Sequence, residues 1–316
     1  MKPEIHYEFA DVSVIVPAFQ ASDTITRALV SIAEQTLKPV EVVVVDDGSI
    51  DDTFEIAKAF GPHMNGIRLQ VFQSKSNKGA GAARNFAIEK SSGSILAFLD
   101  ADDEWLPKKL ERSLAYLVDS DYSFVAHNYW TGDGDDSIHC DCERRFCEGN
   151  DAFVALYRKG YVPSCSVVAP REQVIAAGGF DPTLRNAQDF DFWLAMTRDS
   201  DATFLVFGEP LLRYHMSNDG IMGHTARRLE CCLKIARRYM PDLKHRTNFA
   251  LFSVWFRIAA IYLEAVCAFG KKGRFISMIL TIMAFPLSLI RMTGCYFFRS
   301  SNPRGKYLKL SDSEKG

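Results

Sequence analysis

The stretch VVVVDDGSIDDT, residues 42–53, decides which fold we predict for this chain of 316 residues. Four consecutive valines before a turn signal are typical of a strand that is buried on both faces, as in a parallel sheet. The segment DDGS (46–49) then lies at the carboxyl end of that strand, which is the edge where open α/β sheets bind ligands. The alternative is an acidic turn in which Asp51 or Asp52 only caps the next helix.

Strand and helix patterns alternate on both sides of this stretch. Their order is strand 12–19, helix 22–36, strand 40–47, helix 51–60, strand 67–74, helix 80–91 and strand 94–103. This alternation predicts an α/β fold in which helices flank a mostly parallel sheet.

After Pro107 the elements become shorter and less regular. We expect helix 108–120, a strand or hairpin arm at 122–130, a loop at 132–150, helix 151–160, strand 164–170, helices 171–180 and 189–199, and a strand pair at 204–215. Helices are also expected around 223–240 and 246–269, followed by an apolar stretch at 275–298. The chain therefore divides into residues 1–110 and 111–220, as two halves of one α/β unit, and a helical tail at 221–316.

The composition indicates a folded protein with an uneven distribution of charge. The chain is 47% hydrophobic and 24% charged, which suits a large core and excludes global disorder. Its eight cysteines are too sparse for a disulfide scaffold, and the first residues contain no apolar leader, so we expect a reducing, cytoplasmic compartment. The net charge is −2, yet residues 221–316 carry 17 basic and 5 acidic side chains. We therefore expect the tail to face an anionic partner.

Carboxylates follow two of the predicted strands. Asp46 and Asp47 come after the second strand, and Asp100, Asp102 and Asp103 come after the fourth. The carboxyl ends of parallel strands share one edge, so both groups are expected there, where a cation or hydrogen-bond donors would offset their repulsion. Hard cations such as Mg²⁺ and Mn²⁺ prefer oxygen ligands of this kind and are often completed by substrate phosphates.

Several motifs, in a fixed order, resemble those of the family 2 glycosyltransferases, which have the GT-A fold. They are VSVIVPAF, VVVVDDGSIDDT, GAGAARNFAI, ILAFLDADD, GGFDPTLRNAQDFDFWL and RYH, and the resemblance extends from about residue 11 to about residue 218. It implies a nucleotide-diphosphate sugar donor, a divalent metal ion and inversion at the anomeric carbon. Residues 1–110 would then form the half that binds the nucleotide sugar, and residues 111–220 the half that binds the acceptor.

The resemblance also assigns residues to the nucleotide. Pro17, Ala18 and Phe19 would line the base pocket at the end of the first strand. Asp47, the second Asp of DDGS, would contact uracil, whose imide N–H a carboxylate can accept. Arg84 of AARN would approach the nucleotide.

Metal binding is expected at the DxD segment. Asp100 would bond the ribose or bridge to the metal, and Asp102 would coordinate Mn²⁺ or Mg²⁺. His215 of RYH resembles a late histidine of the family and would serve as a further ligand, because a neutral imidazole binds metals. The alternative for His215 is an ordinary surface histidine. The metal would offset the charge of the leaving diphosphate.

An inverting transfer also requires a base for the acceptor hydroxyl. The family's base is the Asp of a Glu-Asp pair before a helix, and this chain has Gln188-Asp189 there, so Asp189 is the predicted base. The glutamine removes a neighbouring negative charge that would raise the pKa of Asp189. Asp191 is the second choice, and the alternative for Asp189 is a helix N-cap.

The tail contains sixteen uncharged residues, Phe275 to Ile290, which Pro286 interrupts and Arg291 follows. A spanning helix needs about twenty predominantly apolar residues. Basic residues flank the stretch: Lys271, Lys272 and Arg274 before it, and Arg299, Arg304, Lys306 and Lys309 after it. This pattern favours a helix that lies in the interface of an anionic membrane. The alternatives are a helix pair packed on the catalytic domain and one true span.

The sequence thus predicts an inverting, metal-dependent transfer of a sugar from a UDP-sugar to a lipid-linked saccharide. The resemblance is to bacterial enzymes that build surface polysaccharides at the cytoplasmic face of the inner membrane. Two alternatives are a soluble glycosyltransferase that modifies a protein or small molecule, and a non-catalytic nucleotide-sugar binder, which Gln188 keeps open. No nucleic-acid motif is found.

Overall fold

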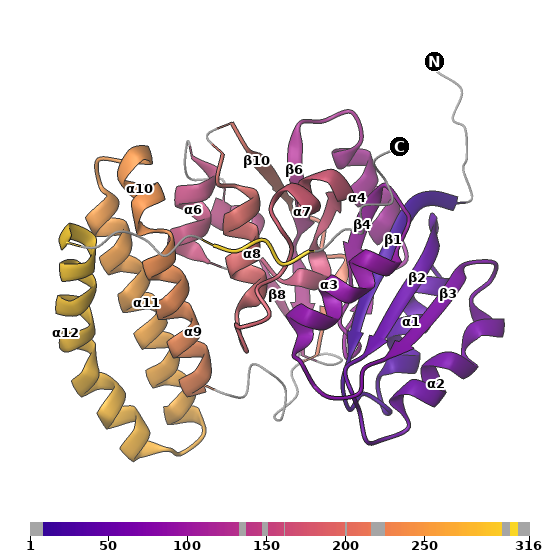
Figure 1. Ribbon diagram of the computed structural model, residues 1–316, viewed down its shortest axis with the longest axis horizontal. Helices are drawn as coiled ribbons and strands as arrows, with labels where there is room; N and C mark the ends of the chain where they lie inside the picture. The colour runs from indigo at the N-terminus through magenta and orange to yellow at the C-terminus, as the bar shows by residue number, and fades with distance from the viewer. Residues whose placement is uncertain are drawn as a thin grey trace.

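The computed structural model describes residues 9–132, 137–146, 151–160, 162–199, 201–215, 225–298 and 304–308. Sheets with flanking helices occupy one side of the molecule, and the helices of the tail form a separate group on the other side (Figure 1).

The main sheet has the strand order β10-β6-β9-β4-β1-β2-β3. Its strands are β1 (Phe9–Ala18), β2 (Lys38–Asp46), β3 (Arg68–Gln73), β4 (Ile95–Phe98), β6 (Tyr122–His127), β9 (Val168–Pro170) and β10 (Thr203–Phe207). Strands β4, β1, β2 and β3 run parallel, as do β6 and β10, whereas β9 is antiparallel to both of its neighbours. The predicted mostly parallel sheet is therefore confirmed.

The four valines at 42–45 are fully buried within β2, as the continuous apolar run predicts. The helices of this part are α1 (Ile25–Ala33), α2 (Thr53–Ala59), α3 (Ala80–Lys90), α4 (Lys109–Leu117), α6 (Ala152–Lys159), α7 (Arg171–Ala176) and α8 (Gln188–Met196). Short 3₁₀ turns lie at Gly61–His63 and Ser164–Ser166.

A second, smaller sheet has the order β5-β11-β7-β8, with β5 (Glu104–Trp105), β7 (Tyr129–Thr131), β8 (Ile138–Cys140) and β11 (Leu212–Tyr214). The observed elements correct three details of the sequence prediction. The strand predicted at 94–103 ends at Phe98, and the predicted loop at 132–150 contains β8 and the short helix α5 (Glu143–Phe146). The predicted strand pair at 204–215 is divided between the two sheets, because β10 pairs with β6 and β11 pairs with β5 and β7.

The tail contains α9 (Thr225–Arg238), α10 (Met240–Arg246), α11 (Ala250–Lys271) and α12 (Phe275–Phe298). Helix α11 packs against α9, α6 and α12. By length and composition, α11 and α12 could each cross a membrane, with mean hydropathies of 1.6 and 1.9. They differ in environment, since 44% of the apolar window of α11 is buried but only 11% of that of α12.

The segment 304–308, which we call the C-terminal strap, returns to the α/β part and lies beside α7 and α8 (Figure 1). Arg304 donates to the Asp191 carboxylate at 2.8 Å and to the carbonyl oxygen of Ala177 at 2.5 Å. The Tyr307 amide donates to the Gly178 carbonyl oxygen at 2.7 Å. Arg304 was expected to be a basic flank for a membrane surface, and this expectation is wrong because its side chain is only 5% exposed and ion-paired.

Arg299 and Lys309, which complete the predicted basic flank, lie outside the described residues. Lys306 is exposed, as are Lys271, Lys272 and Arg274 on the other side of α12. Of the predicted basic flank, three of the four described residues that stay exposed therefore lie at the turn between α11 and α12.

Candidate active site

The DDGS loop follows β2 and is closed by its own carboxylates. The Asp47 amide donates to the Ala18 carbonyl oxygen at 2.8 Å, and the Asp47 carboxylate accepts from the amides of Lys78 at 3.0 Å and Gly79 at 2.6 Å. Asp46 accepts from the Ser49 amide at 3.1 Å. Asp47 therefore ties the end of β2 to the start of α3, and its predicted contact with uracil would add to these bonds.

Gly48 allows this loop to approach its neighbour closely. Its φ is +77°, and an added Cβ would lie 2.8 Å from the Ser76 carbonyl carbon. Of the three residues predicted to line the base pocket, Pro17 and Ala18 are buried, whereas Phe19 is 45% exposed at the end of β1. Phe19 thus offers an accessible aromatic face on the same edge as the DDGS loop.

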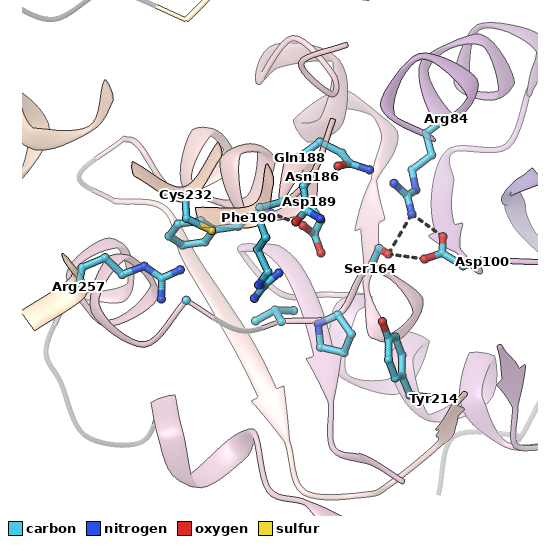
Figure 2. Close-up of a pocket in the computed structure, with 15 residues that line it drawn as sticks. Arg84, Asp100, Ser164, Asn186, Gln188, Asp189, Phe190, Tyr214, Cys232 and Arg257 are labelled. Carbon is cyan, nitrogen blue, oxygen red and sulfur yellow. Dashed lines mark hydrogen bonds and ion pairs between the residues drawn. The ribbon is translucent and has the colours of Figure 1, made fainter. Parts of the chain in front are cut away.

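Arg84, on α3, meets Asp100 in the turn after β4 (Figure 2). Its Nη2 contacts the Asp100 carboxylate and donates to Ser164 Oγ at 3.2 Å, while Ser164 donates to the other Asp100 oxygen at 3.3 Å. Burial lowers the pKa of the Arg84 guanidinium, but the carboxylates of Asp100 and Asp189 outweigh burial and raise it overall. The guanidinium is therefore a fixed positive charge between the two predicted site carboxylates.

The turn after β4, which we call the acidic turn, carries Asp100, Asp102 and Asp103. Their carboxylates differ in burial and in the groups that they contact. Burial, and then the charge of Asp100, raises the pKa of Asp102 to about 6. Asp103 is 1% exposed and accepts from the His215 amide at 3.0 Å. The Oδ2 atom of Asp103 is buried and has no hydrogen-bond partner among the described residues.

The ligand atoms of Asp100, Asp103 and Cys165 lie within 4.8 Å of one another. Burial raises the pKa of the Cys165 thiol, and a protonated thiol is a poor ligand for Mg²⁺ or Mn²⁺. The half-buried Asp102 and the partly exposed Asp100 suit a hard cation better, because a divalent charge would offset the repulsion that raises the Asp102 pKa. The residues present therefore fit a divalent cation on this turn.

His215 follows β11, and its backbone is held by Asp103. Its Nε2 lies 3.7 Å from a carboxylate oxygen of Glu104, and its side chain is 18% exposed. The imidazole is thus near the acidic turn rather than on the open surface, and its role as a metal ligand stays a prediction.

Asp189 lies at the second residue of α8 and faces the same pocket as Asp100 (Figure 2). Burial raises its pKa, against the opposing effect of Arg84. Asp189 is not the N-cap residue, but its carboxylate accepts from the Phe190 amide in the first turn of α8 at 2.8 Å. The N-cap residue is Ala187, with a φ of +55°. A non-glycine residue in this region is strained, and such strain clusters at functional sites. Gln188 is 5% exposed, and none of the described residues donates a hydrogen bond to its Oε1.

Asp191, the second choice for the base, is excluded by its partners. It is fully buried and accepts from Arg238 at 2.5 Å and from Arg304 at 2.8 Å. The Tyr239 hydroxyl donates to its carbonyl oxygen at 2.9 Å. Both carboxylate oxygens are therefore used to hold the tail and the strap on α8, which leaves Asp189 as the accessible carboxylate of the pair.

The pocket encloses roughly 700 Å³ of empty space, part of it open to solvent, and Figure 2 shows its lining. It is lined by Arg84, Asp100, Gly160, Val162, Pro163, Ser164, Asn186, Ala187, Gln188, Asp189, Phe190, Tyr214, Arg228, Cys232 and Arg257. It combines the predicted base with Asp100 and Arg84. The residues assigned to the base of the nucleotide, and also Asp102 and His215, are not part of this lining.

Comparison with known proteins identifies the family. The profile described as "Glycosyl transferase family 2" matches residues 13–152. The putative teichuronic acid biosynthesis glycosyltransferase TuaG of Bacillus subtilis is 32% identical over 219 residues, covering 66% of this chain and 81% of TuaG. The chain belongs to glycosyl transferase family 2.

Other relatives and solved structures agree with this membership. The UDP-Glc:alpha-D-GlcNAc-diphosphoundecaprenol beta-1,3-glucosyltransferase WfgD of Escherichia coli is 26% identical, covering 69% of this chain and 82% of WfgD. The crystal structure of S. aureus TarS 1-349 in complex with UDP-GlcNAc has a TM-score of 0.66 at 18% identity, over 90% of this chain and 83% of that one. This family 2 protein is therefore a glycosyltransferase with a GT-A-like fold.

Sequence reasoning missed pocket residues that this family 2 chain draws from outside its motifs. Ser164 was placed in a strand, but it lies in a 3₁₀ turn that brings its hydroxyl to Asp100 and Arg84. Arg228 and Arg257 come from the tail helices α9 and α11. The one available signal was that Arg257 is the only charged residue in the run 250–262.

Proposed function

We propose that this family 2 enzyme transfers a sugar from a UDP-sugar to a hydroxyl of a lipid-linked saccharide, with inversion at the anomeric carbon. The observation that carries the proposal is the pocket in which Asp189 lies together with the pair of Arg84 and Asp100. A base at one side and a fixed charge pair at the other are what a direct displacement requires.

In this proposal Asp189 accepts the proton of the acceptor hydroxyl as that oxygen attacks the anomeric carbon. Because burial raises the pKa of Asp189, its carboxylate is a better proton acceptor than a solvated aspartate. Arg84 stays protonated, and its positive charge limits this increase in the pKa of Asp189. Gln188 provides a buried acceptor, Oε1, that can receive a hydrogen bond from the substrate.

The donor would lie along the carboxyl edge of β1, β2 and β4. Phe19 would contact the uracil ring, and Asp47 would accept its imide N–H in addition to the loop amides. Asp100 and Asp102, with His215, would hold Mn²⁺ or Mg²⁺. That cation would supply charge stabilisation for the departing diphosphate. The solved structure of the mannosyltransferase PcManGT from Pyrobaculum calidifontis in complex with GDP-Man and Mn²⁺ resembles this fold, with a TM-score of 0.59. This similarity supports a divalent metal ion in the proposed reaction.

The lipid-linked acceptor is supported by the relatives and by the tail. WfgD is named for a diphosphoundecaprenol acceptor, and the amylovoran biosynthesis glycosyltransferase AmsB of Erwinia amylovora is 28% identical over 211 residues. Helix α12 exposes an apolar face made of Phe275, Ile276, Ile279, Leu280, Ile282, Met283, Leu287, Ile290, Phe297 and Phe298. We propose that this face lies in the interface of the inner membrane, on its cytoplasmic side.

The strap argues against a single span through α12. The chain enters α12 from α11 and leaves it toward Arg304, which is bound to Asp191 of the α/β part. If α12 alone crossed the bilayer, its two ends would lie on opposite sides, and the strap could not reach Asp191. Helix α11 cannot readily supply the second crossing, because 44% of its apolar window is buried against the protein. In-plane attachment satisfies both constraints.

Nucleotide binding tests this proposal most directly. UDP, CDP and GDP are titrated with and without Mn²⁺ against the wild type, Asp102→Asn and the control Asp121→Asn, an exposed carboxylate. We expect UDP-selective binding that requires Mn²⁺ and is lost only in Asp102→Asn. Metal-independent binding, or equal affinity for the three nucleotides, would contradict the donor assignment. Turnover of UDP-sugars with lipid-linked saccharides then identifies the sugar.

A further inference from the structure

Arg257 is an arginine of the apolar tail helix α11 that reaches the active-site pocket (Figure 2). Arg257 is 2% exposed, and its Nε has no hydrogen-bond partner within the part of the chain that the structure describes. The guanidinium carbon lies 4.5 Å from the centroid of the Phe190 ring. Phe190 is the residue that follows the predicted base Asp189 in the sequence. No salt bridge of Arg257 with a carboxylate is found among the described residues, and a buried guanidinium that lacks such a partner is costly, so its position in the pocket lining favours an anionic ligand.

The backbone opposite Arg257 is built to leave room for its guanidinium. Gly160 ends α6 with a φ of +64°, and an added Cβ would lie 2.2 Å from Arg257 Nη1. Any side chain at this position would therefore displace the guanidinium from the pocket wall. The glycine serves both the left-handed turn and the close approach of the arginine.

A second tail arginine extends this positive region. Arg228, on α9, also lines the pocket and lies 3.5 Å from the half-exposed carboxylate of Glu264. Arg84 is ion-paired with Asp100. The tail end of the pocket therefore carries two guanidinium groups, in the same lining as Asp189. Guanidinium groups bind phosphate oxygens through paired hydrogen bonds, and phosphate is the anion that best matches this arrangement.

Helix α11 carries exposed apolar side chains as well as Arg257. Phe252, Trp255 and Phe256 are exposed on α11 within five residues of Arg257. A ligand with a phosphate head and an apolar chain could thus place its head at Arg257 while its chain stays on the exposed face of the tail. The donor diphosphate does not need these groups, because the acidic turn and its cation are assigned to it.

We propose that Arg257, assisted by Arg228, binds the phosphate groups that join the acceptor saccharide to its lipid carrier. This inference rests on the proposed function and deepens it. The lipid phosphate would be held at the tail end of the pocket, which places the attached sugar beside Asp189 with a hydroxyl toward the donor. The tail then acts as part of the acceptor site as well as a membrane attachment.

Binding of farnesyl diphosphate in neutral detergent tests the proposal, with farnesol, inorganic pyrophosphate and UDP plus Mn²⁺ as comparison ligands. The variants are Arg257→Gln and Arg228→Gln, and the control is Arg237→Gln, which removes an exposed arginine from α9. We expect saturable binding of farnesyl diphosphate that is tenfold or more weaker in Arg257→Gln, several-fold weaker in Arg228→Gln and unchanged in the control. Arg257→Lys, which keeps the charge, should recover part of the loss.

The comparison ligands separate the possible results. UDP binding should stay within twofold of the wild type in both variants, which also shows that they are folded. If Arg257→Gln weakens UDP as much as farnesyl diphosphate, or weakens neither, the proposal is overturned. Equal, Arg257-dependent binding of inorganic pyrophosphate would overturn the lipid assignment. Absence of UDP binding by the wild type, with farnesyl diphosphate still bound through Arg257, would instead refute the proposed function alone.

Discussion

Replacing Asp189 with Asn separates the chemical role of this side chain from its structural role. The amide has nearly the same shape but cannot accept the acceptor proton. General-base catalysis contributes about 10²- to 10⁴-fold, so we expect kcat to fall by that factor, which corresponds to about 3–5 kcal/mol in activation free energy. The acidic limb of the wild-type pH profile should lie above 3.8, the usual pKa of this carboxyl, because burial raises it.

The same substitution should not weaken the fold. Since the folded pKa of Asp189 is raised, the ionised carboxylate is less favourable in the folded state than in the unfolded chain. Stability from this group is present at low pH and is lost as the pH rises through the folded pKa. An uncharged amide avoids that cost, so at pH 7.5 we expect the free energy of unfolding of Asp189→Asn to equal or exceed that of the wild type.

Asp191→Asn is the matched control, two residues away on the same helix. It removes the buried partner of Arg238 and Arg304, and breaking a buried pair costs about 3–5 kcal/mol. Transfer from a UDP-sugar is measured beside urea unfolding for both variants. Retention of more than a tenth of wild-type kcat by Asp189→Asn would refute the reasoning. Loss of activity in Asp191→Asn without loss of stability would refute it as well.

Further expectations concern the core, the loop and the tail. Hydrogen bonds outweigh burial and lower the pKa of Glu41 to about 2. The stability that this carboxylate contributes is therefore present above pH 4.5 and is lost as the pH falls from 4.5 to 2. In Glu41→Gln, the free energy of unfolding should depend less on pH over that range. In Gly48→Ala, the Cβ 2.8 Å from Ser76 should cost about 1–3 kcal/mol of unfolding free energy and weaken UDP binding in calorimetry. Ile276→Asp with Met283→Asp, both on the exposed face of α12, should reduce co-sedimentation with anionic vesicles severalfold while nucleotide binding is kept.

Much of the fold could be predicted because its determinants are local. The valines at 42–45 specify a strand buried on both faces, and the DDGS turn follows directly, so the sheet edge was placed correctly. Asp189 was chosen from its position in a motif, and its exposure to the pocket agrees with that choice. Strand ends were less accurate, as at Phe98, because residue types alone do not reveal where backbone pairing between strands stops.

The sequence by itself determined the family, the order of strands and helices along the α/β part, and the chemical groups of the candidate site. Only the tertiary structure decided which groups meet across long separations in the chain. Arg304 reads as a membrane-facing cation in the sequence, yet it is bound to Asp191, and Arg257 reads as a break in an apolar helix, yet it enters the pocket. Charge and hydropathy patterns report which face a helix can bury, whereas the contacts of α9 and α11 with α6 and α8 determine what that face meets.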